Sequence, residues 1–186
     1  MENQKNNVLS SNKVRGLTST CFLDARSVPY SLDDGFQTLR HKEFVASVFR
    51  TFGLSVGTLP NRIAFQKTFY ILQQLGIDRK FVFSWHHFGP YSAELAQIGF
   101  SLNEGDIVNA SILSGKEIEQ FKELKKDNEK NSRFLEMMAD IVFIKKNNPS
   151  IKKEDLFKEI VLHRDYLDDK NLFNLAIERL TRFNLF

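Results

Sequence analysis

Apolar residues recur three or four positions apart after Leu39, and this spacing places them on one face of a helix. The set consists of Phe44, Val45, Val48, Phe49 and Phe52. Gly53 follows directly, and glycine is the residue found most often just beyond a helix C-terminus. The pattern therefore predicts a first amphipathic helix that ends before Gly53.

A second apolar run, within residues 62–75, covers more than half of a helix circumference, so this helix is expected at the centre of the core. The apolar members are Ile63, Ala64, Phe65, Phe69, Ile71, Leu72 and Leu75. Asn61 is the expected N-cap, and Gly76 ends the helix. The remaining face holds the polar residues Arg62, Gln66, Lys67, Tyr70, Gln73 and Gln74.

The apolar and polar positions alternate over residues 80–85, which predicts a short strand. Gly89-Pro90 interrupts the alternation, and proline is favoured in the first turn of a helix. We therefore expect a third helix from Pro90 to about Asn103. Residues 107–113 are predicted to form a second short strand.

The last third of the chain is helical in pattern and strongly charged. Ser114 and Glu117 have the spacing of a capping box, which opens a charged helix. Residues 125–133 are almost wholly polar, and we interpret them as a boundary between subdomains. Three more helices are expected beyond it, over 134–146, over 152–163 and after Asp168 as N-cap.

Together these patterns predict a mainly α fold with one or two short β elements. Residues 1–37 are rich in Asn, Ser, Thr and Gly and lack periodicity, which is typical of a flexible arm. Residues 38–125 are expected to form one helical domain and residues 131–186 a second helical subdomain. The C-terminal order of helix, turn and capped helix predicts helix-turn-helix, winged-helix-like subdomains that share a core.

Composition adds limits rather than a function. Of 186 residues, 42% are hydrophobic, which supports a globular core, and the net charge of +3 is compatible with nucleic acid without indicating it. The single cysteine, Cys21, excludes an internal disulfide and a cysteine-based zinc site. No segment approaches the roughly 20 apolar residues of a membrane helix. We expect a cytoplasmic protein with no cofactor and no membrane partner.

The segment WHHFGPYS, residues 85–92, contains the only tryptophan and two of the four histidines. Neighbouring residues on a strand point to opposite sides, so His86 and His87 are not expected to bind one metal ion. The chain has no nucleophile elbow and no glycine-rich phosphate motif, so we predict no catalytic residue and no metal site. We interpret the segment as a strand-to-helix corner that exposes Trp85, His86, His87 and Tyr91 to a protein partner.

Cationic and amide side chains outside the apolar stripe of the last helix suggest a nucleic-acid surface. Arginine and asparagine side chains can read guanine and adenine edges in the major groove. The predicted DNA-binding residues are Lys170, Asn171, Asn174, Arg179 and Arg182, with Arg62 and Lys67 in second place.

Two separated motifs resemble a known family. NRIAFQKTFYILQQLG and FVFSWHHFGPYSAELAQ, residues 61–76 and 81–97, are similar to the YwgA-like family of uncharacterised prokaryotic proteins, which is related in pattern to the Panacea, or SocA-like, antitoxin domain. The family patterns are K-L-Q-K-x-x-Y-L-x-x-x-x-G and Y-G-P-Y-S-x-x-L. The matching residues are Phe65, Gln66, Lys67, Tyr70, Leu72 and Gly76, then Phe88, Gly89, Pro90, Tyr91, Ser92 and Leu95. Phe88 replaces a tyrosine and Ala64 a basic residue, and the likeness covers about forty residues well.

The resemblance implies a mostly helical fold and a role in regulation by binding, with no catalytic residue. The leading hypothesis is a regulatory binding protein, antitoxin-like or associated with transcription or defence, that contacts DNA, protein or both and can act as a homodimer. One alternative is a protein-only interaction module or adaptor. Another is a small enzyme that uses His86 or His87 as acid or base.

Overall fold

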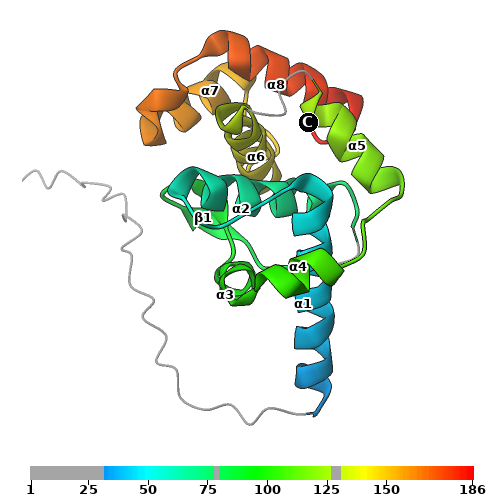
Figure 1. Ribbon diagram of the computed structural model, residues 1–186. Helices are drawn as coiled ribbons and strands as arrows, with labels where there is room; N and C mark the ends of the chain where they lie inside the picture. Colours follow the sequence, from blue (N-terminus) through cyan, green and yellow to red (C-terminus); the bar gives the residue numbers. More distant parts are fainter. Residues whose placement is uncertain (1–31, 78–79, 127–130) are drawn as a thin grey trace, which may run out of the picture.

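The computed structural model describes residues 32–77, 80–126 and 131–186, with side chains from Leu39 onward (Figure 1). This part of the chain is mainly helical and has one two-stranded sheet, so the predicted fold class is confirmed at that level. The helices of the first half are α1 (Leu32–Phe52), α2 (Leu59–Gln74), α3 (Ala93–Ser101), α4 (Glu104–Asn109) and α5 (Lys116–Lys125). Those of the second half are α6 (Ser132–Asn147), α7 (Lys153–His163), the 3-10 turn η1 (Asp165–Leu167) and α8 (Lys170–Arg182). The sheet pairs β1 (Ser84–His86) with β2 (Gly89–Tyr91).

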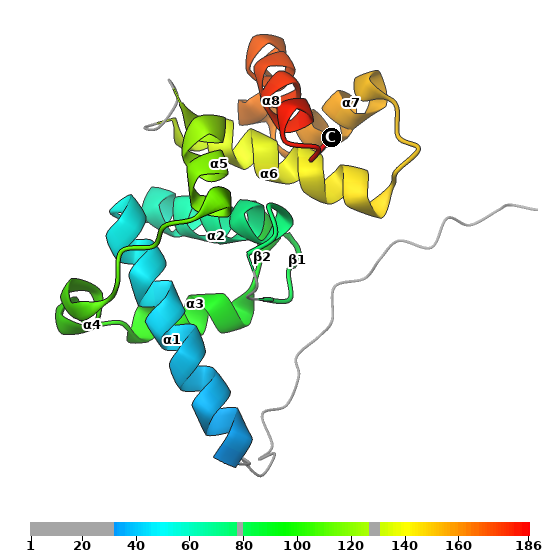
Figure 2. The same cartoon turned by 90° about the vertical axis from the view of Figure 1, so that its right-hand side faces the viewer.

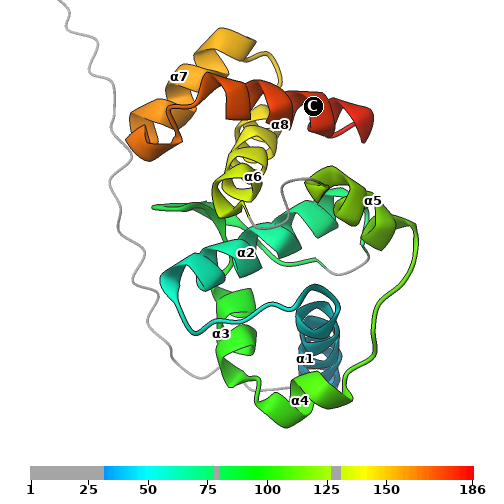
Figure 3. The same ribbon diagram turned by 45° about the horizontal axis from the view of Figure 1, so that its top comes forward.

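Helix α2 lies in the middle of the molecule, as its wide apolar face predicts. Figures 1 and 2 show α1, α3 and α4 on one side of it, and α6 on the other, with α7 and α8 packed beyond α6. The buried hydrophobic residues form one cluster that extends from Val45 in α1 to Leu180 in α8. The two halves of the chain therefore contribute to the same core, and the view in Figure 3 shows α6 crossing over α2.

Of the predicted arm, residues 1–37, the part up to residue 31 lies outside the residues that the structure describes. Its boundary is wrong, because α1 already begins at Leu32. At the other end, α1 stops at Phe52 and Gly53 has φ +61°, which agrees with the predicted helix end. In the described helices, no stretch combines the length and apolar character needed to cross a membrane.

Three predicted helix starts are wrong in detail. Thr58, not Asn61, caps α2, because Pro60 occupies the first turn and the Thr58 side chain accepts the Asn61 N–H. Asp169, not Asp168, caps α8 by accepting from the N–H groups of two residues in its first turn. The Ser114 capping box does not form, since α5 begins after Gly115 without a side-chain cap.

The Gly89-Pro90 dipeptide forms β2 instead of the first turn of a helix. The hairpin, defined here as residues 84–91, pairs Trp85 with Pro90 and His86 with Gly89 in an antiparallel ladder. Gly89 has φ +85°, which suits the tight connection between the strands. The predicted helix starts three residues later, at Ala93, and Ser92 caps it by accepting the Leu95 N–H.

The strand predicted over residues 107–113 is absent from the structure. Asn103 and Asp106 form a reciprocal capping box, with both hydrogen bonds at 2.9 Å, and this starts α4. Lys42 of α1 pairs with Asp106 at 2.9 Å and fixes α4 against α1. The local cap therefore outweighs the β propensity of the short apolar run that follows it.

Candidate functional site

Two glutamines of α2 hold the segment that leads into and out of the hairpin. Gln66 is 4% exposed, and its amide donates to the Ser92 carbonyl at 3.1 Å and accepts from the Ser92 N–H at 2.9 Å. Gln73, two helical turns later, makes the same pair of bonds with Phe81, at 3.0 and 2.7 Å. Each side chain thus replaces the backbone partner that a neighbouring strand would supply.

Lys67 is buried rather than displayed, so its assignment to a DNA-binding surface is wrong. Its side chain is 1% exposed, and the ammonium donates to the Pro90 carbonyl at 2.9 Å. Burial lowers the pKa of Lys67 to about 8, although the nearby Asp140 carboxyl opposes this shift. The ammonium of Lys67 therefore does not lie on an outer surface that the DNA backbone could contact.

Lys67 belongs to a buried polar cluster, which we define as Lys67, Glu136, Asp140 and Arg164. Arg164, 1% exposed after the end of α7, places Nη1 2.8 Å from Asp140 Oδ2 and Nε 3.8 Å from Glu136 Oε1. Its Nη2 also donates to the His86 carbonyl at 3.2 Å. The cluster therefore connects α2, α6 and the residue after α7 to both strands of the hairpin.

The hairpin backbone lies directly against this cluster at Gly89. A Cβ atom at this position would overlap Asp140 Oδ1 and lie 3.1 Å from Lys67 Nζ. Any side chain here would force the carboxylate away from its place. Glycine is thus required both by the backbone angle and by the close approach of β2 to α6.

Burial also shifts the acids of the cluster. It raises the pKa of Asp140 to about 7, against the opposing charges of Arg164 and Lys67. It raises the pKa of Glu136 as well, although the hydrogen bond from the Tyr166 hydroxyl acts in the other direction. The folded protein therefore binds more protons at Asp140 than the unfolded chain does between about pH 4 and pH 7.

Because the folded protein holds more protons at Asp140, we predict that Asp140 makes the protein less stable as the pH rises. Its contribution to the free energy of unfolding falls as the pH rises from about 4 to 7 and is constant above that range. Asp140→Asn removes the titration, so the slope of its stability against pH should be more positive than that of the unmodified protein, by up to about 1.4 kcal/mol per pH unit. Urea denaturation of both proteins at pH 5, 6 and 7 measures the difference. Equal slopes would contradict the assigned protonation.

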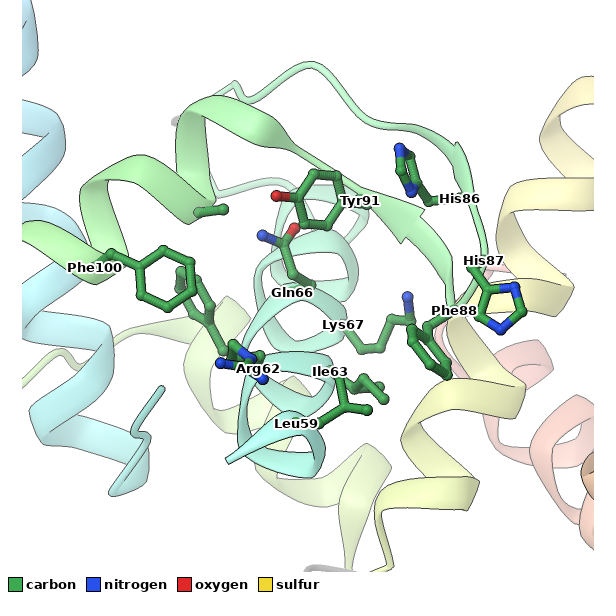
Figure 4. Close-up of a pocket in the computed structure, with 13 residues that line it drawn as sticks. Leu59, Arg62, Ile63, Gln66, Lys67, His86, His87, Phe88, Tyr91 and Phe100 are labelled. Carbon is green, nitrogen blue, oxygen red and sulfur yellow. The ribbon is translucent and has the colours of Figure 1, made fainter. Parts of the chain in front are cut away.

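The hairpin separates two hollows of the surface. On one side lies an apolar pocket of about 360 Å³ between α2, the hairpin and α3 (Figure 4). On the other side lies what we call the imidazole groove, of about 390 Å³, lined by Trp85, His86, His87, His163 and Arg164. His86 and His87 line both hollows, so the hairpin turn forms a ridge between them.

The residues predicted to bind a partner gather at this ridge. His86 and His87 are exposed, whereas Trp85 and Tyr91 are half-buried. The Trp85 ring lies 4.4 Å from the Arg164 guanidinium and 5.4 Å from the Phe143 ring. Trp85 therefore has a structural role as well, since it covers the buried arginine.

The cluster residues Glu136, Asp140 and Arg164 were not anticipated from the sequence. Two acids four residues apart in the otherwise apolar stretch FLEMMADIVF, residues 134–143, were the available signal, because such acids are buried only when paired. Arg164 had no comparable signal, since it lies in an irregular turn. Only the fold brings it beside α6.

The predicted nucleic-acid residues do not form one surface. Lys170, Asn171, Asn174 and Arg182 are exposed on α8, but Arg179 donates to the Glu123 carbonyl at 3.2 Å. Arg182 pairs with Glu178 on the same helix. Arg62 lies elsewhere, at the apolar pocket. The α8 residues remain a prediction.

A metal site has no support among the described side chains, where no three of His, Cys, Asp or Glu converge on a common point. Comparison of the chain with protein-family models, curated protein sequences and solved structures gives no match.

Proposed function

We propose that this chain is a regulatory binding protein whose main contact surface is the hairpin ridge, and that its partner is another protein. The observation that carries the proposal is the contrast between the two sides of the hairpin. Its inner side is fixed by buried polar groups, while His86 and His87 at the turn are exposed between two hollows.

A fixed hairpin favours binding because little conformational entropy is lost when a partner orders it. Both strands are held, one by Arg164 at the His86 carbonyl and the other by Lys67 at the Pro90 carbonyl. Most two-stranded hairpins are only marginally stable without such support. The buried polar cluster is therefore interpreted as the support of a recognition element.

The chemistry of the ridge suits a protein surface. Protein interfaces are enriched in aromatic residues and arginine and have a polar rim. Here Trp85 and Phe88 are half-buried, and the exposed imidazoles of His86 and His87 can donate or accept hydrogen bonds. Leu162, 78% exposed on α7, continues the surface beside His163 of the imidazole groove.

Nucleic-acid binding through α8 is the second candidate. The exposure of Lys170, Asn171 and Asn174 favours it. The engagement of Arg179 with Glu123 and of Arg182 with Glu178 speaks against it, because these cations are already partnered by the protein. We therefore rank protein binding first. The winged-helix-like character of the subdomains and the antitoxin-like role remain part of this proposal, as does assembly into a homodimer.

Site-specific photocrosslinking tests the proposal. We expect a photoreactive phenylalanine analogue in place of His87 to give a discrete adduct with one protein in the cells that produce this chain. The same analogue in place of Lys158, which is exposed on α7, serves as the matched control and should give none. The adducted protein is then purified and must bind the unmodified chain with defined stoichiometry.

Two results would oppose the proposal. Adducts of equal yield and identity at His87 and Lys158 would show random encounters. A purified partner that binds the His86→Ala/His87→Ala variant as tightly as the unmodified chain would place the contact elsewhere.

A further inference from the structure

The apolar pocket beside the hairpin has the size and lining of a small-ligand site. Its volume of about 360 Å³ lies within the range of pockets that enclose small organic ligands. The apolar part of the wall comes from the start of α2, the hairpin turn and α3 (Figure 4). These wall residues include Leu59, Ile63, Phe65, Phe88, Ala96 and Phe100.

The charged groups of this wall are all of one sign. Arg62 and Lys67 line the pocket, and no described aspartate or glutamate lines it. His86 and His87 add two imidazoles at the hairpin side. An apolar cavity with only cationic groups favours an anionic head on an apolar body, because an anion there gains attraction from every charge in the wall.

Lys67 is the specific feature of the pocket. An ammonium group has three N–H donors. In the described part of the chain Lys67 has one hydrogen-bond acceptor, the Pro90 carbonyl, and no carboxylate within the 4.0 Å of a salt bridge. Lys67 is nevertheless only 1% exposed, so the remaining N–H donors of its ammonium have little access to bulk water.

Asp140 and Glu136 attract the Lys67 ammonium, but neither acid accepts a hydrogen bond from it. Asp140 faces Arg164 at 2.8 Å, and burial raises the pKa of Asp140 to about 7, which leaves this carboxyl only partly ionised at neutral pH. Buried N–H donors of Lys67 that lack an acceptor are costly. A ligand carboxylate in the pocket would accept hydrogen bonds from these donors.

We propose that the pocket binds an organic monocarboxylate with an apolar body, its carboxylate directed toward Lys67 and its body packed against Ile63, Phe88 and Phe100. Arg62, exposed at the mouth, attracts the anion. A phosphate dianion fits less well, because the largely apolar wall would leave its second charge unpaired. The carboxylate belongs either to a free small acid or to the end of a polypeptide chain.

This inference goes beyond the proposed protein contact and does not depend on it. The purified full chain is titrated by calorimetry with 3-phenylpropionate and octanoate, and with the alcohols of the same carbon skeletons. We expect at least one acid to bind about tenfold or more tightly than its alcohol, as a charge-assisted hydrogen bond implies. Two short peptides ending in Leu-Phe, one with a free carboxylate and one amidated, form the second arm. Binding of the free acids alone, or of the carboxylate peptide alone, identifies the source of the ligand.

Variants locate the bound carboxylate. Lys67→Met should abolish the preference for acid over alcohol. If Lys67→Met does not fold, Phe100→Asp tests the proposal instead. Phe100 is 57% exposed, so the substitution should be tolerated, and the new acid repels an anion at the pocket. Val82→Asp, at an 83% exposed position outside the pocket, is the matched control. We expect Phe100→Asp to weaken acid binding about tenfold and Val82→Asp to change it less than twofold.

The inference is overturned if acids and alcohols bind with equal affinity, or if neither the acids nor the carboxylate peptide binds below about 10 mM, the affinity of a weak fragment. Crosslinking at His87 can succeed in either case, so a failure of the ligand site is distinguishable from a failure of the proposed protein contact.

Discussion

Gly89→Ala is expected to destabilise the protein by about 3 kcal/mol or more. A positive φ costs a residue with a side chain about 1–2 kcal/mol, and overpacking a close contact typically adds about 1–3 kcal/mol. Both conditions hold here, since Gly89 has φ +85° and its Cβ would overlap Asp140 Oδ1. For a chain of this size such a loss lowers the melting temperature by about 10 °C, as thermal denaturation would show.

Gly53→Ala is the matched control for this substitution. Gly53 has φ +61°, and a Cβ atom added there would meet nothing within 4 Å, so only the backbone cost of about 1–2 kcal/mol applies. The excess loss at Gly89 therefore measures the contact with Asp140. Equal losses at the two glycines would refute the close approach of β2 to α6.

A double-mutant cycle separates the contact from the backbone cost further. Asp140→Ala removes the oxygen that the new Cβ would meet, so Gly89→Ala should cost less in that background. Contacting residues show coupling energies of about 0.5–3 kcal/mol. Strict additivity of the two substitutions would contradict the geometry at Gly89.

The sequence predicted the elements whose signal is repeated along the chain. The apolar faces of α1 and α2 recur over several turns, and both ends of α2 and the C-terminal end of α1 were placed within a few residues of the observed ends, whereas α1 begins seven residues before the predicted start at Leu39. Single-residue signals were less reliable. Pro90 suits the first turn of a helix as well as an edge strand, and only the pairing of β1 with β2 decided between them.

The candidate site was predicted in part, for a related reason. The segment WHHFGPYS was recognised as unusual because its residue types are rare, and its histidines are exposed at the ridge. The buried polar cluster was missed because its members lie far apart in the sequence, with 97 positions between Lys67 and Arg164 (164 − 67). Lys67 was assigned to the surface because lysine is seldom buried. Periodicity reports the face of a helix, not the partner that covers it.

Arg164→Ala is expected to have an even larger effect than Gly89→Ala, of about 3–5 kcal/mol, because it leaves two buried carboxyls without their principal cation. The substitution also removes the bond to the His86 carbonyl and uncovers one face of Trp85. Trp85 is the only tryptophan, so its fluorescence reports on the hairpin alone. Urea denaturation followed by this fluorescence measures both the loss of stability and the change in the native hairpin.

Two further variants identify the cause of the loss. Arg182→Ala breaks an exposed pair with Glu178, so it should change stability by no more than about 0.5 kcal/mol. Arg164→Lys keeps the charge but should restore only part of the loss, because one ammonium cannot reach Asp140, Glu136 and the His86 carbonyl as the planar guanidinium does. If lysine restored the full stability, the positive charge of Arg164 alone would account for its contribution. The penalty of Arg164→Ala should also be smaller at pH 5 than at pH 8, since the acids left behind can then be neutralised by protonation.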